Sequence, residues 1–184
     1  MREAIAYVTN AVVIGIGATA FMDIIAALRT RFLGTPAANY TLVGRWLAYC
    51  ARGRFHHPSI ATTPPIHRET AIGWSAHYLI GIAFATVLLV IWGLEWSCNP
   101  TIIPALIVGI ASVAAPFLLM QPAMGSGIAA SRTPNPAAAR LRSLIAHAIF
   151  GVGLYVAGEL AARVGQLDCV GATTNINAHI ALLA

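Results

Sequence analysis

Four strongly polar side chains stand inside long apolar stretches of this sequence: Asp23, His77, Gln121 and His147. A charged side chain in membrane hydrocarbon costs roughly 2.5–3.5 kcal/mol on insertion scales, so such a residue usually has a function or a specific partner. Carboxylate and imidazole groups ligate transition metals, transfer protons or hydrogen-bond to each other. Which of these they do depends on the arrangement of the helices that carry them.

The composition is typical of a membrane protein. Of 184 residues, 58% are hydrophobic and 9% charged, and the mean hydropathy is +0.75; a soluble domain carries about 25% charged residues. Four windows are long enough to cross ~30 Å of hydrocarbon at ~1.5 Å per residue, and they cover residues 4–28, 71–96, 102–124 and 144–164. We therefore predict an all-α fold, an integral membrane four-helix bundle that forms a single transmembrane domain over residues 1–184.

The arginines are distributed unevenly along the chain. The net charge is +5, lysine is absent, and nine of the 11 arginines lie in the first and third connections: Arg29, Arg31, Arg45, Arg52, Arg54, Arg68, Arg132, Arg140 and Arg142. The positive-inside rule places both connections in the cytoplasm and both termini outside, in a bacterial inner membrane. The charge thus needs no nucleic-acid partner, and the absence of lysine excludes Schiff-base chemistry.

The first connection begins with a helix signal. Asn39 is a typical N-cap, and the residues after it form an apolar stripe at helical spacing, which predicts a short helix over residues 40–52 lying in the inner interface. The prolines between residues 58 and 65 exclude regular helix, so that segment either covers the bundle or forms a surface connection. Pro116 should kink the third span and leave the carbonyl of Ser112 in need of another donor.

Small residues at four-residue intervals accompany each of the four polar side chains, as at Gly15 and Thr19 before Asp23. This spacing lets membrane helices approach closely, so we expect the four stripes to face one another rather than lipid. Asp23 lies six residues from Arg29, and His147 five residues from Arg142, or roughly 9 and 7.5 Å along a helix. The polar side chains should therefore meet at one depth, toward the cytoplasm.

The leading hypothesis for this cluster is a metal- or haem-binding site in a membrane protein, and the protein would then be a redox enzyme. Asp23, His77 and His147 are the predicted metal ligands, because imidazoles with a carboxylate form a standard ligand set. The predicted supporting residues are Gln121 in the bundle and Glu69, His57 and Arg45 from the first connection. The cofactor would be a transition metal or haem, although no HExxH, CxxC or ExxH motif occurs.

Several alternatives use the same residues. A buried aspartate and histidine can simply hydrogen-bond to each other, or they can catalyse acid–base chemistry without a metal. They can also form the path of a proton or small-solute transporter. In a third class of function, the chain is an accessory subunit of a larger membrane complex or a homo-oligomer, and the small-residue stripes are assembly surfaces.

Two cysteines fall on the predicted outer side, Cys98 after the second span and Cys169 beyond the fourth. Disulfides persist on that side of the membrane, so these two residues either form a bond or remain two free thiols. Cys50 falls on the cytoplasmic side and should stay reduced.

Segments of the chain resemble an uncharacterised bacterial inner-membrane family of unknown function. The resemblance is carried by GATAFMD at 17–23, VGRW at 43–46, GWSAHY at 73–78, PFLLMQP at 116–122, ASRTP at 130–134 and the run at 147–155. It extends over nearly the whole chain, and it implies that the family pattern includes Asp23, Arg45, Glu69, His77, Gln121 and His147. It implies a fold and a site, and no particular reaction.

Overall fold

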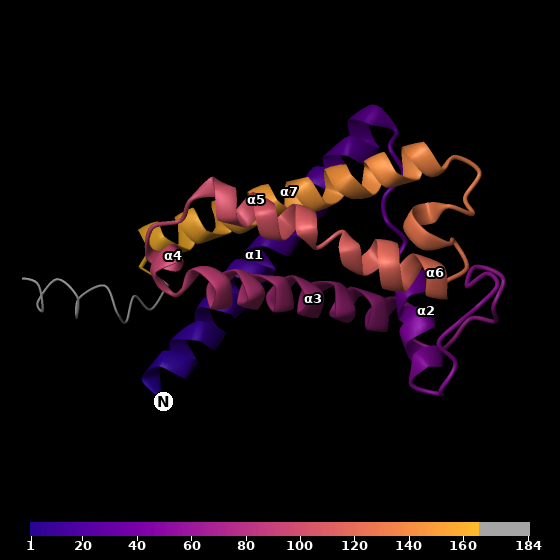
Figure 1. Cartoon of the computed structure of the whole chain (residues 1–184), viewed down its shortest axis with the longest axis horizontal. Helices are drawn as coiled ribbons and strands as arrows, with labels where there is room; N and C mark the ends of the chain where they lie inside the picture. Colours follow the sequence, from indigo (N-terminus) through magenta and orange to yellow (C-terminus); the bar gives the residue numbers. More distant parts are fainter. Residues whose placement is uncertain (166–184) are drawn as a thin grey trace, which may run out of the picture.

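The computed structural model describes residues 1–165, and every regular element within that range is helical. Four helical segments are long and apolar enough to cross a membrane: α1 (Arg2–Leu33), α3 (Glu69–Trp92), Ile102–Ala123 and α7 (Pro136–Arg163). They run along the long axis of the molecule, and α1 crosses behind the others (Figure 1). The predicted all-α fold with four membrane helices is confirmed.

Two short helices lie at opposite ends of these four. Helix α2 (Tyr40–Cys50) begins after Asn39, whose side chain accepts a hydrogen bond from the Thr41 backbone N–H at 3.1 Å. It lies across one end of the bundle, steeply inclined to α3 (Figure 1). Helix α4 (Glu95–Cys98) makes the turn after α3 at the other end.

The third membrane segment is broken rather than only kinked. It consists of α5 (Ile102–Ala111), a π-helical turn η1 (Pro116–Met120) and α6 (Gln121–Ala123), and a 3₁₀ turn η2 (Ile128–Ala130) follows. Pro116 has no N–H, so the carbonyl of Ser112 accepts instead from the Ala115 N–H at 3.1 Å. The prediction that this carbonyl needs another donor is confirmed, whereas the π-turn, a feature common at functional sites, was not predicted.

The small-residue stripes bring the helices together in two pairs. A Cβ atom at Gly15 of α1 would lie 2.5 Å from the Ile82 Cα of α3, and one at Gly109 of α5 would overlap the backbone of Gly151 in α7. Helix α1 packs equally closely along α7, where a Cβ atom at Gly153 would lie 2.8 Å from the Ala18 carbonyl oxygen, and this contact joins the two pairs. The four stripes thus meet as α1 with α3 and α5 with α7, rather than around one common axis.

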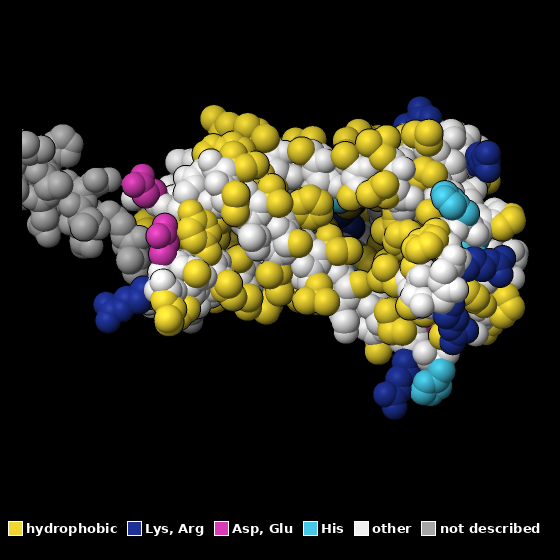
Figure 2. Space-filling model, turned by 60° about the horizontal axis from the view of Figure 1, so that its bottom comes forward, with side chains coloured by type: hydrophobic (Ala, Val, Ile, Leu, Met, Phe, Trp, Pro, Cys, Tyr) yellow, Lys and Arg dark blue, Asp and Glu magenta, His cyan; other side chains and the backbone are white. Residues whose placement is uncertain are grey.

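The buried apolar core fills only the half of the bundle near α4. Its members include Ile14, Leu88, Leu89, Trp96, Val108 and Leu154. Helix α3 contacts α5, and none of the buried core members lies in η1 or α6. Outer faces carry exposed apolar side chains such as Leu79 and Val90, as contact with lipid requires (Figure 2). The half of the bundle near α2 therefore has room for a cavity between the helices.

The segment after α2 covers that end of the bundle. The Arg45 guanidinium donates to both carboxylate oxygens of Glu69, at 2.8 and 2.7 Å, and to the carbonyl oxygens of Ile60, Ala61 and Thr63 at 3.3, 3.3 and 2.8 Å. Backbone hydrogen bonds also join the segment to the end of the third membrane segment, from the His57 N–H to the Ala123 carbonyl and from the Ile60 N–H to the Met124 carbonyl. The sequence left two possibilities for this segment, a cover over the bundle or a surface connection, and the structure shows the cover.

The glycine contact gives a first prediction. Gly15→Ala should lower the free energy of unfolding by about 1–3 kcal/mol, because the new methyl group meets the α3 backbone, which cannot rotate away. The control is Ala4→Val, which enlarges a side chain on the exposed face of α1 and should change stability by no more than about 0.5 kcal/mol. Thermal unfolding in detergent measures both, and equal effects would contradict the close contact.

Candidate functional site

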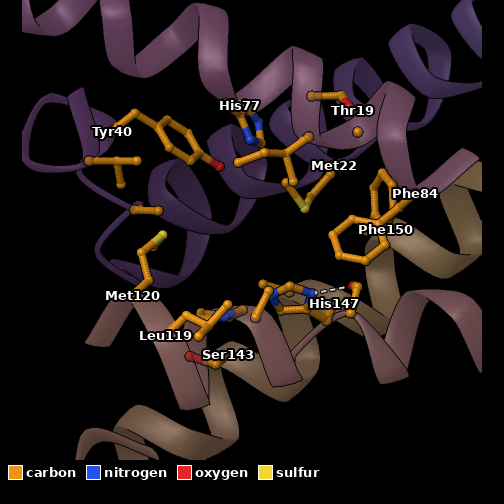
Figure 3. A pocket seen from close by; sticks show the side chains of 18 of the residues that line it. Thr19, Met22, Tyr40, His77, Phe84, Leu119, Met120, Ser143, His147 and Phe150 are labelled. Carbon is orange, nitrogen blue, oxygen red and sulfur yellow. Dashed lines mark hydrogen bonds between the residues drawn. The ribbon is translucent and has the colours of Figure 1, made fainter. Parts of the chain in front are cut away.

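A cavity of about 400 Å³ lies between the α1–α3 pair on one side and η1, α6 and α7 on the other (Figure 3). Most of its wall is apolar, with Met22, Ile80, Phe84, Leu119, Met120 and Phe150 among the lining residues. Tyr40, His77, Gln121, Ser143 and His147 add polar groups. Three of the four polar side chains singled out in the sequence thus line one cavity, and the fourth, Asp23, is hydrogen-bonded to His77.

Asp23 and His77 form a hydrogen-bonded pair between α1 and α3. His77 Nε2 lies 3.0 Å from Asp23 Oδ1, and the Tyr78 hydroxyl donates to Asp23 Oδ2 at 3.2 Å. The side chains of His77 and Asp23 are only 10% and 20% exposed. Both carboxylate oxygens therefore have partners, which offsets the cost of placing a carboxylate among apolar helices.

Tyr40 brings α2 into the site. Its ring stacks on the His77 imidazole with centroids 3.9 Å apart and planes inclined by 23°, and its hydroxyl points into the cavity (Figure 3). Burial and the nearby negative charge of Asp23 raise the pKa of the Tyr40 phenol. The phenol is protonated at neutral pH, so it can donate a hydrogen bond to a molecule in the cavity.

His147 presents an acceptor from the opposite wall. Its Nδ1 lies 2.7 Å from the Ser112 hydroxyl (dashed in Figure 3), and that hydroxyl donates to the Gly109 carbonyl at 2.6 Å. Because a hydroxyl has one hydrogen, His147 Nδ1 must be the donor to Ser112. The remaining nitrogen, Nε2, then carries a lone pair, and no side chain within residues 1–165 hydrogen-bonds to it.

Gln121 lies where the cavity meets a second one of about 560 Å³, whose wall includes Asp23, Arg29 and Arg142. Its Oε1 is buried and has no hydrogen-bond partner in the described part of the chain. An amide oxygen left in this state costs about 1–3 kcal/mol. A donor group on a bound molecule would remove that cost.

The other predicted site residues lie elsewhere. Arg45 and Glu69 bind each other and hold the covering segment, and neither lines either cavity. His57 is buried in that segment with its Nδ1 3.4 Å from the Thr63 hydroxyl, and it does not line the cavities either. Cys169 lies outside the described residues, so its bond with Cys98 stays a prediction.

The structure does not assemble the three predicted metal ligands into one group. Asp23 and His77 bind each other, whereas His147 binds Ser112 from another helix pair. Over residues 1–165, no three histidine, cysteine, aspartate or glutamate side chains are grouped as they would need to be to hold a metal ion. The pairing of Asp23 with His77 was among the alternatives, whereas Tyr40 and Ser112 were not foreseen as site residues.

These features define a multi-pass helical membrane protein with a cavity between its helices. The chain belongs to the family described as "Protein of unknown function (DUF2938)", whose model matches residues 12–161. This match confirms the resemblance to an uncharacterised family over nearly the whole chain, and it includes all the residues that line the first cavity. No curated protein and no solved structure matches the chain.

The Asp23–His77 contact gives a second prediction. In a double-mutant cycle, Asp23→Ala and His77→Ala should couple by about 0.6 kcal/mol and by no more than about 1.7 kcal/mol, the range known for hydrogen bonds between membrane helices. The control cycle combines Asp23→Ala with His147→Ala, whose effects on the free energy of unfolding should add to within about 0.5 kcal/mol. Unfolding free energies in mixed detergent measure both cycles. Strong coupling in the control cycle would instead support a shared metal ion.

Proposed function

We propose that the protein binds a small, largely apolar molecule, taken from the lipid bilayer, in the cavity between its two helix pairs. The observation that carries this proposal is the cavity itself, about 400 Å³ with an apolar wall and a few polar groups directed into it. Small-molecule sites usually have volumes of about 300–1,000 Å³ and this kind of lining. A helix bundle that served only as a structural subunit would gain stability by filling that space.

The route into the cavity is from the side. The covering segment lies across the end of the bundle, whereas Ile80 and Leu119 line the cavity and are 44% and 68% exposed on the outer surface. Figure 2 shows a hollow on one side of the molecule, bordered by hydrophobic side chains. A lateral opening of this kind admits molecules dissolved in the membrane and excludes strongly hydrated ones.

The polar groups favour a ligand that carries oxygen. The Tyr40 hydroxyl can donate to it, and His147 Nε2 can accept from it across the cavity. His77 connects the cavity to Asp23, so a proton can pass between the bound molecule and this pair. Both a proton-linked transporter and an enzyme acting on a membrane-soluble substrate are compatible with this arrangement.

Haem is the second candidate ligand, because His77 and His147 lie on opposite sides of the same apolar cavity (Figure 3). His147 has a free Nε2 for iron, whereas His77 Nε2 is held by Asp23. His77 would therefore have to break that hydrogen bond or bind through Nδ1. The apolar-ligand proposal requires no such change.

We place the protein in the bacterial inner membrane with the α2 end in the cytoplasm. Figure 2 shows several arginines gathered at one end of the molecule, and acidic side chains together with an arginine at the other. Short loops that are rich in arginine stay in the cytoplasm, so this asymmetry supports the prediction that both termini lie outside.

The orientation gives a third prediction. In a background in which Cys50, Cys98 and Cys169 are replaced by serine, Ala61→Cys in the covering segment should react with a membrane-impermeant maleimide only in inverted vesicles. Glu3→Cys, at the other end of the molecule, should react only in intact spheroplasts. The reverse pattern would contradict the proposed orientation.

Binding in the cavity gives a fourth prediction. Ala115→Phe places a large side chain in the cavity, whereas the control Ala114→Phe places the same group on the exposed surface next to it. Native mass spectrometry of protein released from mild detergent should find a co-purified small molecule on the wild type and on Ala114→Phe. We expect the fraction of protein that carries this molecule to fall by about ten-fold or more in Ala115→Phe, because the phenylalanine ring and the bound molecule compete for the same space in the cavity.

Three results would count against this proposal. An unoccupied wild type that also fails to take up added palmitoyl lipid would favour the accessory-subunit alternative. Equal occupancy in the two phenylalanine variants would place the bound molecule outside the cavity. A Soret absorption band that disappears in His147→Ala would identify haem as the ligand instead.

A further inference from the structure

The second cavity, of about 560 Å³, is continuous with the first. Six residues line both: Met22, Ala38, Tyr40, Gln121, Ser143 and Ala146. The second cavity extends between α1 and α7 toward the arginine-rich end of the molecule. Through the hollow in Figure 2 a dark-blue side chain is visible, which is an arginine because the chain has no lysine. One elongated molecule can therefore occupy both spaces.

The second cavity differs from the first in charge. Arg29 of α1, which is half-buried, and Arg142 of α7, which is exposed, both line it, and within residues 1–165 neither guanidinium group makes a hydrogen bond or an ion pair. The one carboxylate among its lining residues is Asp23, whose two oxygens are taken by His77 and Tyr78. Two arginines thus line the same space without a free counter-charge, and guanidinium groups bind phosphate oxygens well.

Uncharged donors add to this arrangement. Ser126 and Ser143 line the second cavity, and their hydroxyls make no hydrogen bond within the described residues. Gln121 Oε1, which is buried and unpartnered, stands where the two cavities join and can accept from a hydroxyl of a bound molecule. The site therefore matches a molecule with an apolar end, a hydroxyl in the middle and an anionic end.

We infer that the two cavities together hold an anionic phospholipid, with an acyl chain in the first cavity and the phosphate group between Arg29 and Arg142. This inference rests on the proposed function, and it names the class of ligand. A free phosphate would leave the adjoining apolar cavity empty, whereas a lipid fills both. The depth agrees, because Arg29 lies six residues, or roughly 9 Å, beyond Asp23 toward the membrane surface, where lipid phosphates lie.

Arginines at a membrane surface are often only solvated, and the chain offers an internal control for that case. Arg31, two residues after Arg29 on the same helix, is exposed and lines neither cavity. If solvation or general attraction to anionic lipid accounts for the positions of the arginines, Arg29 and Arg31 should contribute equally to lipid binding. If the cavity holds the headgroup, only Arg29 and Arg142 should contribute.

The test uses the full-length protein and two lipids that differ in headgroup charge. Palmitoyl lysophosphatidylglycerol carries a phosphate group and monopalmitoylglycerol carries none, whereas their acyl chains are the same. Native mass spectrometry gives the affinity of each. We expect the wild type to bind the anionic lipid about ten-fold or more tightly, as the loss of a charge-assisted hydrogen bond implies. Arg29→Gln and Arg142→Gln should remove this preference without weakening binding of the uncharged lipid, and Arg31→Gln should preserve it.

The remaining outcomes separate the two proposals. If both lipids bind the wild type equally and Ala115→Phe still blocks them, the headgroup inference is wrong and the apolar cavity stands. If neither lipid binds, the proposed function fails as well. If inorganic phosphate alone binds with an Arg29- and Arg142-dependent affinity and excludes the lipid, the ligand is a free anion, and the lipid inference is overturned.

Discussion

Close backbone contacts hold the four membrane helices together, at Gly15 between α1 and α3, at Gly109 between α5 and α7, and at Gly153 between α7 and α1. At each of these points the two backbones lie too close for a side chain to fit between them, so the helices form a connected row from α3 through α1 and α7 to α5. The space between α3 and the third membrane segment is filled by apolar side chains near α4 and left as a cavity near α2. The break at Pro116 lies beside the cavity, where a regular helix is replaced by a wider turn.

The polar groups of the cavity are held by partners that limit what they can do. Asp23 is bound by His77 and Tyr78, so its charge is compensated within the membrane region. Ser112 fixes the tautomer of His147 and leaves one nitrogen to accept a hydrogen bond. The Arg45–Glu69 ion pair keeps the covering segment across the end of the bundle. Lateral access from the lipid, which we propose, is consistent with this cover.

The four membrane helices, the start of α2 after Asn39 and the distortion at Pro116 could be predicted from the sequence, because each depends only on neighbouring residues in the chain. The approach of Asp23 to His77 also followed from the stripes of small residues. Which helix each stripe contacts could not be predicted, since a stripe shows which face is buried and not which helix covers it. For the same reason His147 was expected beside Asp23, whereas it is bonded to Ser112, and Arg45 was expected at the site, whereas it holds the covering segment.

The central claim is that the space between the helix pairs is a binding site for a bilayer molecule. A cryo-electron microscopy structure of the protein in nanodiscs that contain native bacterial lipid would test this most directly. We expect elongated non-protein density between His77 and His147 that continues to Arg29 and Arg142. Helix pairs that close on each other and leave no space between Phe84 and Leu119 would contradict it.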